Sequence, residues 1–152
     1  MKVAFFRGRH PGWRGLFGVL VKWWTRGDFS HCELLVQSTD GVEWSALSSA
    51  YLDGGVRATR ISLGDDWVVV DVPTTADQQA RALGWFYDHL GQPYDVRGLF
   101  GFVLRRIPGE KGKWFCSEAV AAALGFPESW RLDPNTFYAV LERQAAQVPV
   151  AA

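Results

Sequence analysis

The sequence carries no net charge, no long apolar run and only two cysteines, and each of these features excludes a class of protein. Its 152 residues include 16 basic and 16 acidic side chains, so charge alone predicts no nucleic-acid partner. No apolar stretch approaches the ~18 residues that a membrane-spanning helix needs. Arg7 and Arg9 end the first apolar run too early for a signal peptide, so we expect a cytoplasmic protein. In that reducing setting, Cys32 and Cys116 are expected to be free thiols.

Histidine is also scarce, and this argues against a metal centre. The three histidines are His10, His31 and His89, and no second histidine lies at a ligand spacing from His31. Cys32 and Glu33 follow His31 directly, but in a strand Cys32 would point away from the other two. We therefore expect no metal ion at these residues.

The patterning predicts one α+β domain over residues 1–152. A hydrophobic content of 48% is enough for a compact core, and eight tryptophans leave an excess that can line a ligand groove. Apolar or alternating runs predict strands at 3–6, 29–37, 42–47, 56–61 and 67–72, the last as a central strand. Helices are predicted at 13–24, 76–90, 96–104, 117–124 and 134–147, with a turn at 39–41 and an exposed loop at 105–113. A meander of strands placed between helices predicts an antiparallel sheet packed against helices.

Two of the predicted helices have clear start signals. Thr75 and Gln78 match a capping box, and the helix that follows carries Leu83, Phe86, Tyr87 and Leu90 on one side, which we expect to be buried. Asp133 and Pro134 are typical of an N-cap and a first helical residue.

The segment 114–118 (WFCSE) places Cys116 where an extended run turns into a helix. Strong helix formers follow it, and Gly125 is a natural stop. A thiol at a helix N-terminus lies near the positive end of the helix dipole, which favours the reactive thiolate. A small buried core residue is the simpler interpretation of a cysteine. The aromatic residues before Cys116 and the polar pair after it favour a nucleophile instead.

A nucleophilic cysteine needs a base, and His31 lies in a predicted strand where it could serve. By the alternation of side chains along a strand, Glu33 shares the face of His31, and Cys32 points to the opposite face and into the core. Glu33 could hold the imidazole in its productive tautomer. Ser45 and Glu43, on the strand predicted to pair with this one, could do so instead, and the pattern does not separate the three.

Tyr94 is the third candidate site residue. It follows Pro93 in the segment 91–95 (GQPYD), and its phenol could donate a hydrogen bond to a developing oxyanion. An aromatic plug with its hydroxyl at the surface is the alternative.

The order of these motifs resembles that of the circularly permuted NlpC-type papain-like hydrolases, and in particular the YaeF/YiiX-type amidases and their phage-encoded relatives. The segment 29–34 (FSHCEL) comes before 114–118, the reverse of the order in ordinary papain-like enzymes. The segment 91–95 resembles the Gly-x-Pro-Tyr-Asp element of that family, and Gly54–Gly55–Val56 the Gly-Val that opens its next strand. The resemblance covers roughly residues 3–124 and implies a permuted papain-like fold. It implies that Cys116 is the nucleophile, His31 the general base and Tyr94 the active-site tyrosine, with Ser45 nearest the family's third polar residue.

The resemblance implies a bacterial or phage-related enzyme of the thiol-protease or amidase type. It would cleave an amide bond of a peptide, of peptidoglycan or of a lysine-linked lipid through a thioester, without a cofactor. The expected partner is a small amide- or ester-bearing substrate such as a peptide, a cell-wall fragment or a lipid. A phage enzyme of this kind would act on the cell wall after release, or as part of a virion.

Two alternatives stay open. One is lipid acyl transfer, as in the lecithin–retinol acyltransferase branch of the superfamily, for which segment 13–24 with Lys22 and Arg26 could lie on a membrane surface. We do not favour it, because the same helix can pack into a core. The other is a non-catalytic binding or phage-structural module that keeps the fold and a Trp-rich cleft.

Overall fold

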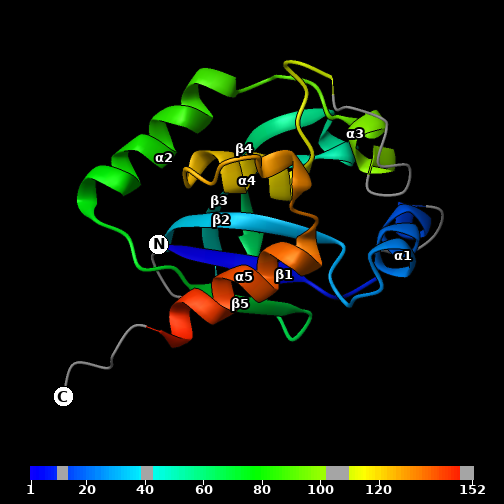
Figure 1. The fold of residues 1–152 in the computed structure, drawn as a ribbon, viewed down its shortest axis with the longest axis horizontal. Helices are drawn as coiled ribbons and strands as arrows, with labels where there is room; N and C mark the ends of the chain where they lie inside the picture. The colour runs from blue at the N-terminus through cyan, green and yellow to red at the C-terminus, as the bar shows by residue number, and fades with distance from the viewer. Residues whose placement is uncertain (10–13, 39–42, 102–109, 148–152) are drawn as a thin grey trace.

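A computed structural model describes residues 1–9, 14–38, 43–101 and 110–147. It is an α+β structure built on a five-stranded antiparallel sheet with the order β4-β3-β2-β1-β5 (Figure 1). The strands are β1 (Lys2–Phe6), β2 (His31–Ser38), β3 (Glu43–Ala50), β4 (Gly55–Ser62) and β5 (Trp67–Asp71). The helices are α1 (Arg14–Thr25), α2 (Ala76–His89), α3 (Val96–Gly101), α4 (Cys116–Ala123) and α5 (Pro134–Ala146), with short 3-10 turns η1 (Tyr51–Asp53) and η2 (Ser129–Arg131). The predicted class, and an antiparallel sheet that includes the His31 strand, are confirmed.

Helices α2, α4 and α5 cover one face of the sheet, and the main core lies beneath them (Figure 1). Strand side chains such as Phe5 and Leu34 meet Phe86 of α2, Val120 of α4 and Phe137 of α5, all of them buried. The opposite face has a smaller apolar cluster around Ala4, Leu35 and Ala46. Helix α1 lies beyond the end of the sheet where β1 stops and β2 starts (Figure 1). None of the helices in the described part of the chain is long and apolar enough to cross a bilayer.

The predicted helix starts at Thr75 and Asp133 are confirmed in atomic detail. The Thr75 hydroxyl accepts from the Gln78 backbone at 3.2 Å, and the Gln78 side chain accepts from the Thr75 backbone at 2.8 Å. Asp133 accepts from the backbone N–H groups of Asn135 and Thr136, with Pro134 as the first helical residue. These capping residues act within one turn of the chain, so they can be recognised reliably in the sequence.

Two predictions about the elements are wrong. Residues 67–71 form an edge strand, because β5 pairs with β1 alone and Val69 is exposed on its outer face. On α2 the buried residues are Ala82 and Phe86, whereas Tyr87 is 72% exposed. A small alanine in the core makes the buried stripe of this helix narrower than the large apolar side chains suggested. The predicted turn at 39–41 and most of the predicted loop at 105–113 lie outside the described residues.

Candidate active site

Cys116 is the first residue of α4, a short helix whose side chains are almost all buried against the sheet and α2. Phe115 before it has an extended backbone, and its N–H donates to the carboxylate of Glu118 at 3.4 Å. The Cys116 side chain is 1% exposed. The thiol therefore lies where the free N–H groups of a helix begin, shielded from bulk water.

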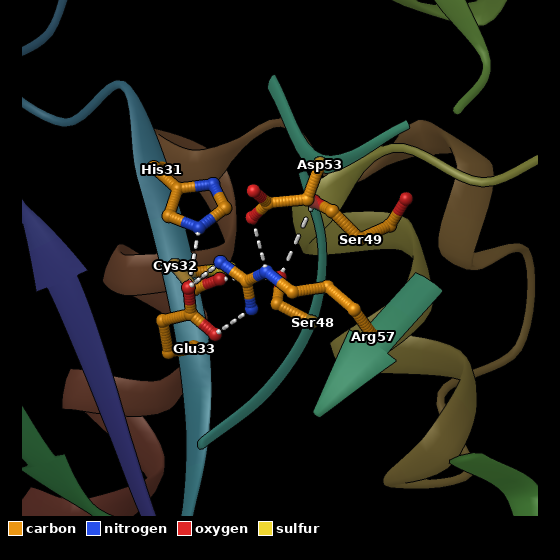
Figure 2. Close-up of polar contacts among 7 residues, drawn as sticks. All are labelled: His31, Cys32, Glu33, Ser48, Ser49, Asp53 and Arg57. Carbon is orange, nitrogen blue, oxygen red and sulfur yellow. Dashed lines mark hydrogen bonds and ion pairs between the residues drawn. The ribbon is translucent and has the colours of Figure 1, made fainter. Parts of the chain in front are cut away.

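His31 is the first residue of β2, and its imidazole lies between an acid and the thiol. Its Nε2 is 2.7 Å from Oε1 of Glu33. This contact is drawn in Figure 2, and the ring also hydrogen-bonds Cys116. About a fifth of the His31 side chain (21%) is exposed, so a substrate can reach it.

The electrostatics of this group favour a charged pair. Burial lowers the pKa of His31, but the Glu33 carboxylate and hydrogen bonds with Cys116 and Glu33 outweigh burial and raise it to about 10. A hydrogen bond from Cys32 is the largest influence on Cys116, and with the His31 contact it holds the pKa of this thiol well below its ordinary value despite burial. Both shifts favour the charged thiolate and imidazolium forms of the pair over the neutral forms.

Glu33 is only 1% exposed, and two cations hold its charge. Besides His31, Arg57 binds it with two parallel hydrogen bonds, Nη1 to Oε2 at 2.9 Å and Nη2 to Oε1 at 2.7 Å. The Nε of Arg57 donates to Asp53 at 2.5 Å, which completes the chain of contacts in Figure 2. Burial alone would raise the pKa of Glu33, but His31 and Arg57 lower it to about 2.

Sequence reasoning missed Arg57 and Asp53. The available signal was the expectation that a carboxylate in a buried strand needs a cationic partner. That rule does not say which of several basic residues supplies it. Only the register of β3 on β4, which pairs Ser48 with Arg57, identifies the residue.

Tyr94 is brought to the same place by backbone pairing. Its N–H donates to Gly54 O at 3.0 Å, and the residue bridges to Trp114, two residues before Cys116. Gly55, with φ of 154°, lies so close to Gln92 that a Cβ there would come within 2.0 Å of the Gln92 carbonyl oxygen. Tyr94 is 9% exposed, and burial together with the nearby Cys116 raises its pKa well above the ordinary value. Tyr94 therefore stays a neutral phenol that can donate a hydrogen bond.

Ser45 and Glu43 do not lie beside His31, so the prediction that either could orient the imidazole is wrong. In an antiparallel hairpin the residues nearest the turn pair with one another. Ser45 pairs with Gln37, and Glu43 pairs with Ser62 on the far side; both are exposed. The serines near the other end of β3 instead bind the backbone beside the site. Ser48 donates a hydrogen bond to Cys32 O, and Ser49 donates one to Trp114 O.

Cys32 is buried in the main core, as alternation along β2 predicts. On that face, however, it hydrogen-bonds Cys116. Burial raises the pKa of Cys32 well above its ordinary value, which favours the neutral thiol. The S–H group of Cys32 can then donate a hydrogen bond to the sulfur of Cys116. Alternation locates the Cys32 side chain correctly but does not say that α4 brings a second thiol to it.

A cavity of about 450 Å³ opens beside the imidazole. His31, Glu33, Arg57 and Tyr94 border its polar end. Its other walls are mainly apolar and come from the sheet, η1 and α1: Phe6, Ile61, Trp67, Tyr51, Leu52, Leu16 and Leu20. Among the described residues, no three His, Cys, Asp or Glu side chains are grouped so that they could hold a metal ion. The arrangement can bind an organic molecule with an apolar part and expose its polar end to His31.

The sequence matches no model of a known protein family, and a comparison with curated proteins likewise finds no match.

Proposed function

We propose that the chain is a cysteine hydrolase of the permuted papain-like type, which cleaves an amide bond through a thioester on Cys116. The observation that carries this proposal is the position of His31, whose imidazole contacts the Glu33 carboxylate on one side and the Cys116 thiol on the other. A nucleophile, a base and a group that orients the base form the arrangement used in acyl transfer. A binding module has no need of a thiol held as a thiolate.

The proposed reaction has two halves. The Cys116 thiolate attacks the amide carbonyl carbon and forms a C–S bond. The carbon becomes tetrahedral, and the π electrons of the C–O double bond move to the oxygen, which becomes an oxyanion. Backbone N–H groups at the start of α4 and the phenol of Tyr94 stabilise that charge. The His31 imidazolium gives its proton to the leaving amine as the C–N bond breaks. In the second half, neutral His31 takes a proton from water, whose oxygen attacks the thioester; the acid leaves and the thiolate and imidazolium are restored.

The apolar cavity suggests which amides would fit. Its walls favour a substrate with an apolar group next to the scissile bond, and the charged residues at one end exclude a wholly apolar one. Peptides with an apolar side chain and lysine-linked lipids meet both conditions.

Acyl transfer from a lipid ester is a second candidate, and the exposed surface of α1 favours it. Leu16, Leu20 and Trp23 are 61%, 48% and 73% exposed, and Leu16 and Leu20 also border the cavity. Such a helix could rest on a lipid surface and pass an acyl chain to the cavity. Turnover of phospholipid esters in vesicles, with no turnover of soluble amides, would select this candidate.

The test of the proposed function is capture of the thioester. Incubation with p-nitroanilides and p-nitrophenyl esters of apolar acids, quenched in acid, should add one acyl mass to Cys116 in intact-protein and peptide mass spectra. Cys116→Ala and His31→Ala should lose the adduct, and Tyr94→Phe should lower kcat by roughly 10- to 100-fold as an oxyanion donor is lost. Ser45→Ala, which changes an exposed serine outside the site, is the matched control and should behave as wild type. Turnover that persists in Cys116→Ala would contradict the proposal.

A further inference from the structure

Arg57 is the one partner of Glu33 that the proposed reaction does not itself use. Each of its three nitrogens donates a hydrogen bond, two nitrogens to Glu33 and Nε to Asp53 (Figure 2). Its guanidinium is therefore held in a fixed orientation at the border of the cavity. A bidentate pair between arginine and a carboxylate fixes the plane of the carboxylate as well as its charge.

The charges along this chain of contacts alternate in sign. Cys116 is negative, His31 positive, Glu33 negative and Arg57 positive, and each contacts the next. These four charges sum to zero and can be buried together, with the Asp53 carboxylate about half exposed to water beyond Arg57. A buried cluster with one net negative charge would instead draw in a proton.

The other ionisable groups around the cluster do not supply this balance. On β2, Cys32 keeps its proton, as does Tyr94 in the loop before α3. Glu118 on α4 has its pKa raised to about 7 by burial, in spite of the Phe115 N–H, and with help from nearby Asp95. Asp53 in η1 is acidic and about half exposed. Among these neighbours Arg57 is the group whose positive charge offsets Glu33 in addition to His31.

We propose that Arg57 is a positioning residue of the site: it aligns the Glu33 carboxylate with His31 and balances its charge, so that the Cys116 thiolate and His31 imidazolium form at neutral pH. This inference rests on the proposed function of Cys116 and His31. Its consequence is that the reactivity of Cys116 on α4 depends on a charge three contacts away, on β4.

The test is the pH profile of Cys116 alkylation by iodoacetamide, followed by peptide mass spectrometry. In Arg57→Gln the lower edge of the reactive plateau should move up by about 1 pH unit or more, because a nearby positive charge is lost. Arg57→Lys keeps the charge but loses the bidentate contact, so its edge should lie between those of wild type and Arg57→Gln. Arg60→Gln is the matched control: it removes an exposed arginine from the same strand, and its profile should not move.

A second pair of variants separates the effect of the Arg57 charge on Cys116 from a structural effect of losing the arginine side chain. Glu33→Gln/Arg57→Gln removes both charges and should recover part of the shift seen in Arg57→Gln. If Arg57→Gln does not fold, Glu33→Gln and the double variant measure the same effect, and the edge should lie lower in Glu33→Gln, where Arg57 is still present.

The outcomes distinguish this inference from the proposed function. A wild-type plateau with no shift in Arg57→Gln, or with equal shifts in Arg57→Lys and Arg57→Gln, would overturn the role of Arg57 and leave the Cys116–His31 pair intact. A wild-type thiol with no plateau would overturn both.

Discussion

At the scale of single residues, the site depends on groups that are expensive to bury one at a time. Glu33 is nearly inaccessible to water, yet His31 and Arg57 keep it ionised. Burial makes each unpaired charge costly, so removing one partner harms more than removing two. The same burial raises the pKa of Cys32 and of Tyr94, which favours their neutral forms.

The depressed pKa of Glu33 gives a prediction about stability at low pH. Its pKa is about 2 in the folded chain against an ordinary 4.5, so the folded state binds this proton less readily. The stabilisation is complete above pH 4.5 and is lost as the pH falls toward 2. The difference corresponds to about 3 kcal/mol as an upper figure.

The measurement is the free energy of unfolding by urea, from pH 6 down to pH 2, in Cys116→Ala and in Cys116→Ala/Glu33→Gln. The Cys116→Ala background removes the titration of the thiol. The two curves should run parallel above pH 5 and converge below pH 4.5. A gap that stays constant down to pH 2 would show that Glu33 is not held ionised by its partners.

At the scale of elements, the start of β2 is held in place by the start of α5. Asn135 donates through Nδ2 to Thr25 Oγ1 at 2.6 Å and to Phe29 O at 2.9 Å, and its Oδ1 accepts from Phe29 N at 2.9 Å. Phe29 lies two residues before His31. Gly27 leaves room for this side chain, since a Cβ there would lie 2.2 Å from Asn135 Cγ.

We predict that Asn135→Ala destabilises the fold by roughly 1 to 3 kcal/mol, because it leaves the backbone groups of Phe29 unpaired. The alkylation rate of Cys116 should fall as well, since His31 follows this turn. Asn135→Asp keeps the acceptor for Phe29 N and should fall between wild type and Asn135→Ala. Thermal unfolding and alkylation at pH 6 measure both effects. Equal melting temperatures for all three proteins would contradict a role for Asn135 in holding β2.

Signals carried by neighbouring residues predicted most of the elements, and pairing between distant strands explains what the sequence did not reveal. The capping residues Thr75 and Asp133 act on the next turn of chain, so they can be read directly. Which β3 residues lie near His31 depends on the register of β2 against β3. In that register Ser45 pairs with Gln37 and therefore lies away from the site. Whether a strand lies at the edge or in the centre is likewise a property of the whole sheet. The β-branched run at 67–71 does not reveal the position of its strand.

At the scale of the whole molecule, the proposed site joins the two faces of the sheet. Cys116 and Cys32 belong to the helix-covered core, whereas Glu33 and Arg57 border the cavity. His31 stands at the end of β2 and contacts both groups. Strand alternation and the helix start at Cys116 predicted Cys116, His31 and Glu33 as site residues, and the position after Pro93 suggested Tyr94. Arg57 and the contact of Cys32 with Cys116 required the packed structure.

The central claim is that His31 turns Cys116 into a thiolate, and the pH dependence of Cys116 alkylation in wild type and His31→Ala tests it most directly. We predict a reactive plateau in wild type that extends down to about pH 5 and disappears in His31→Ala. A single titration near the free-thiol value of about 8.5, unchanged by His31→Ala, would contradict the account.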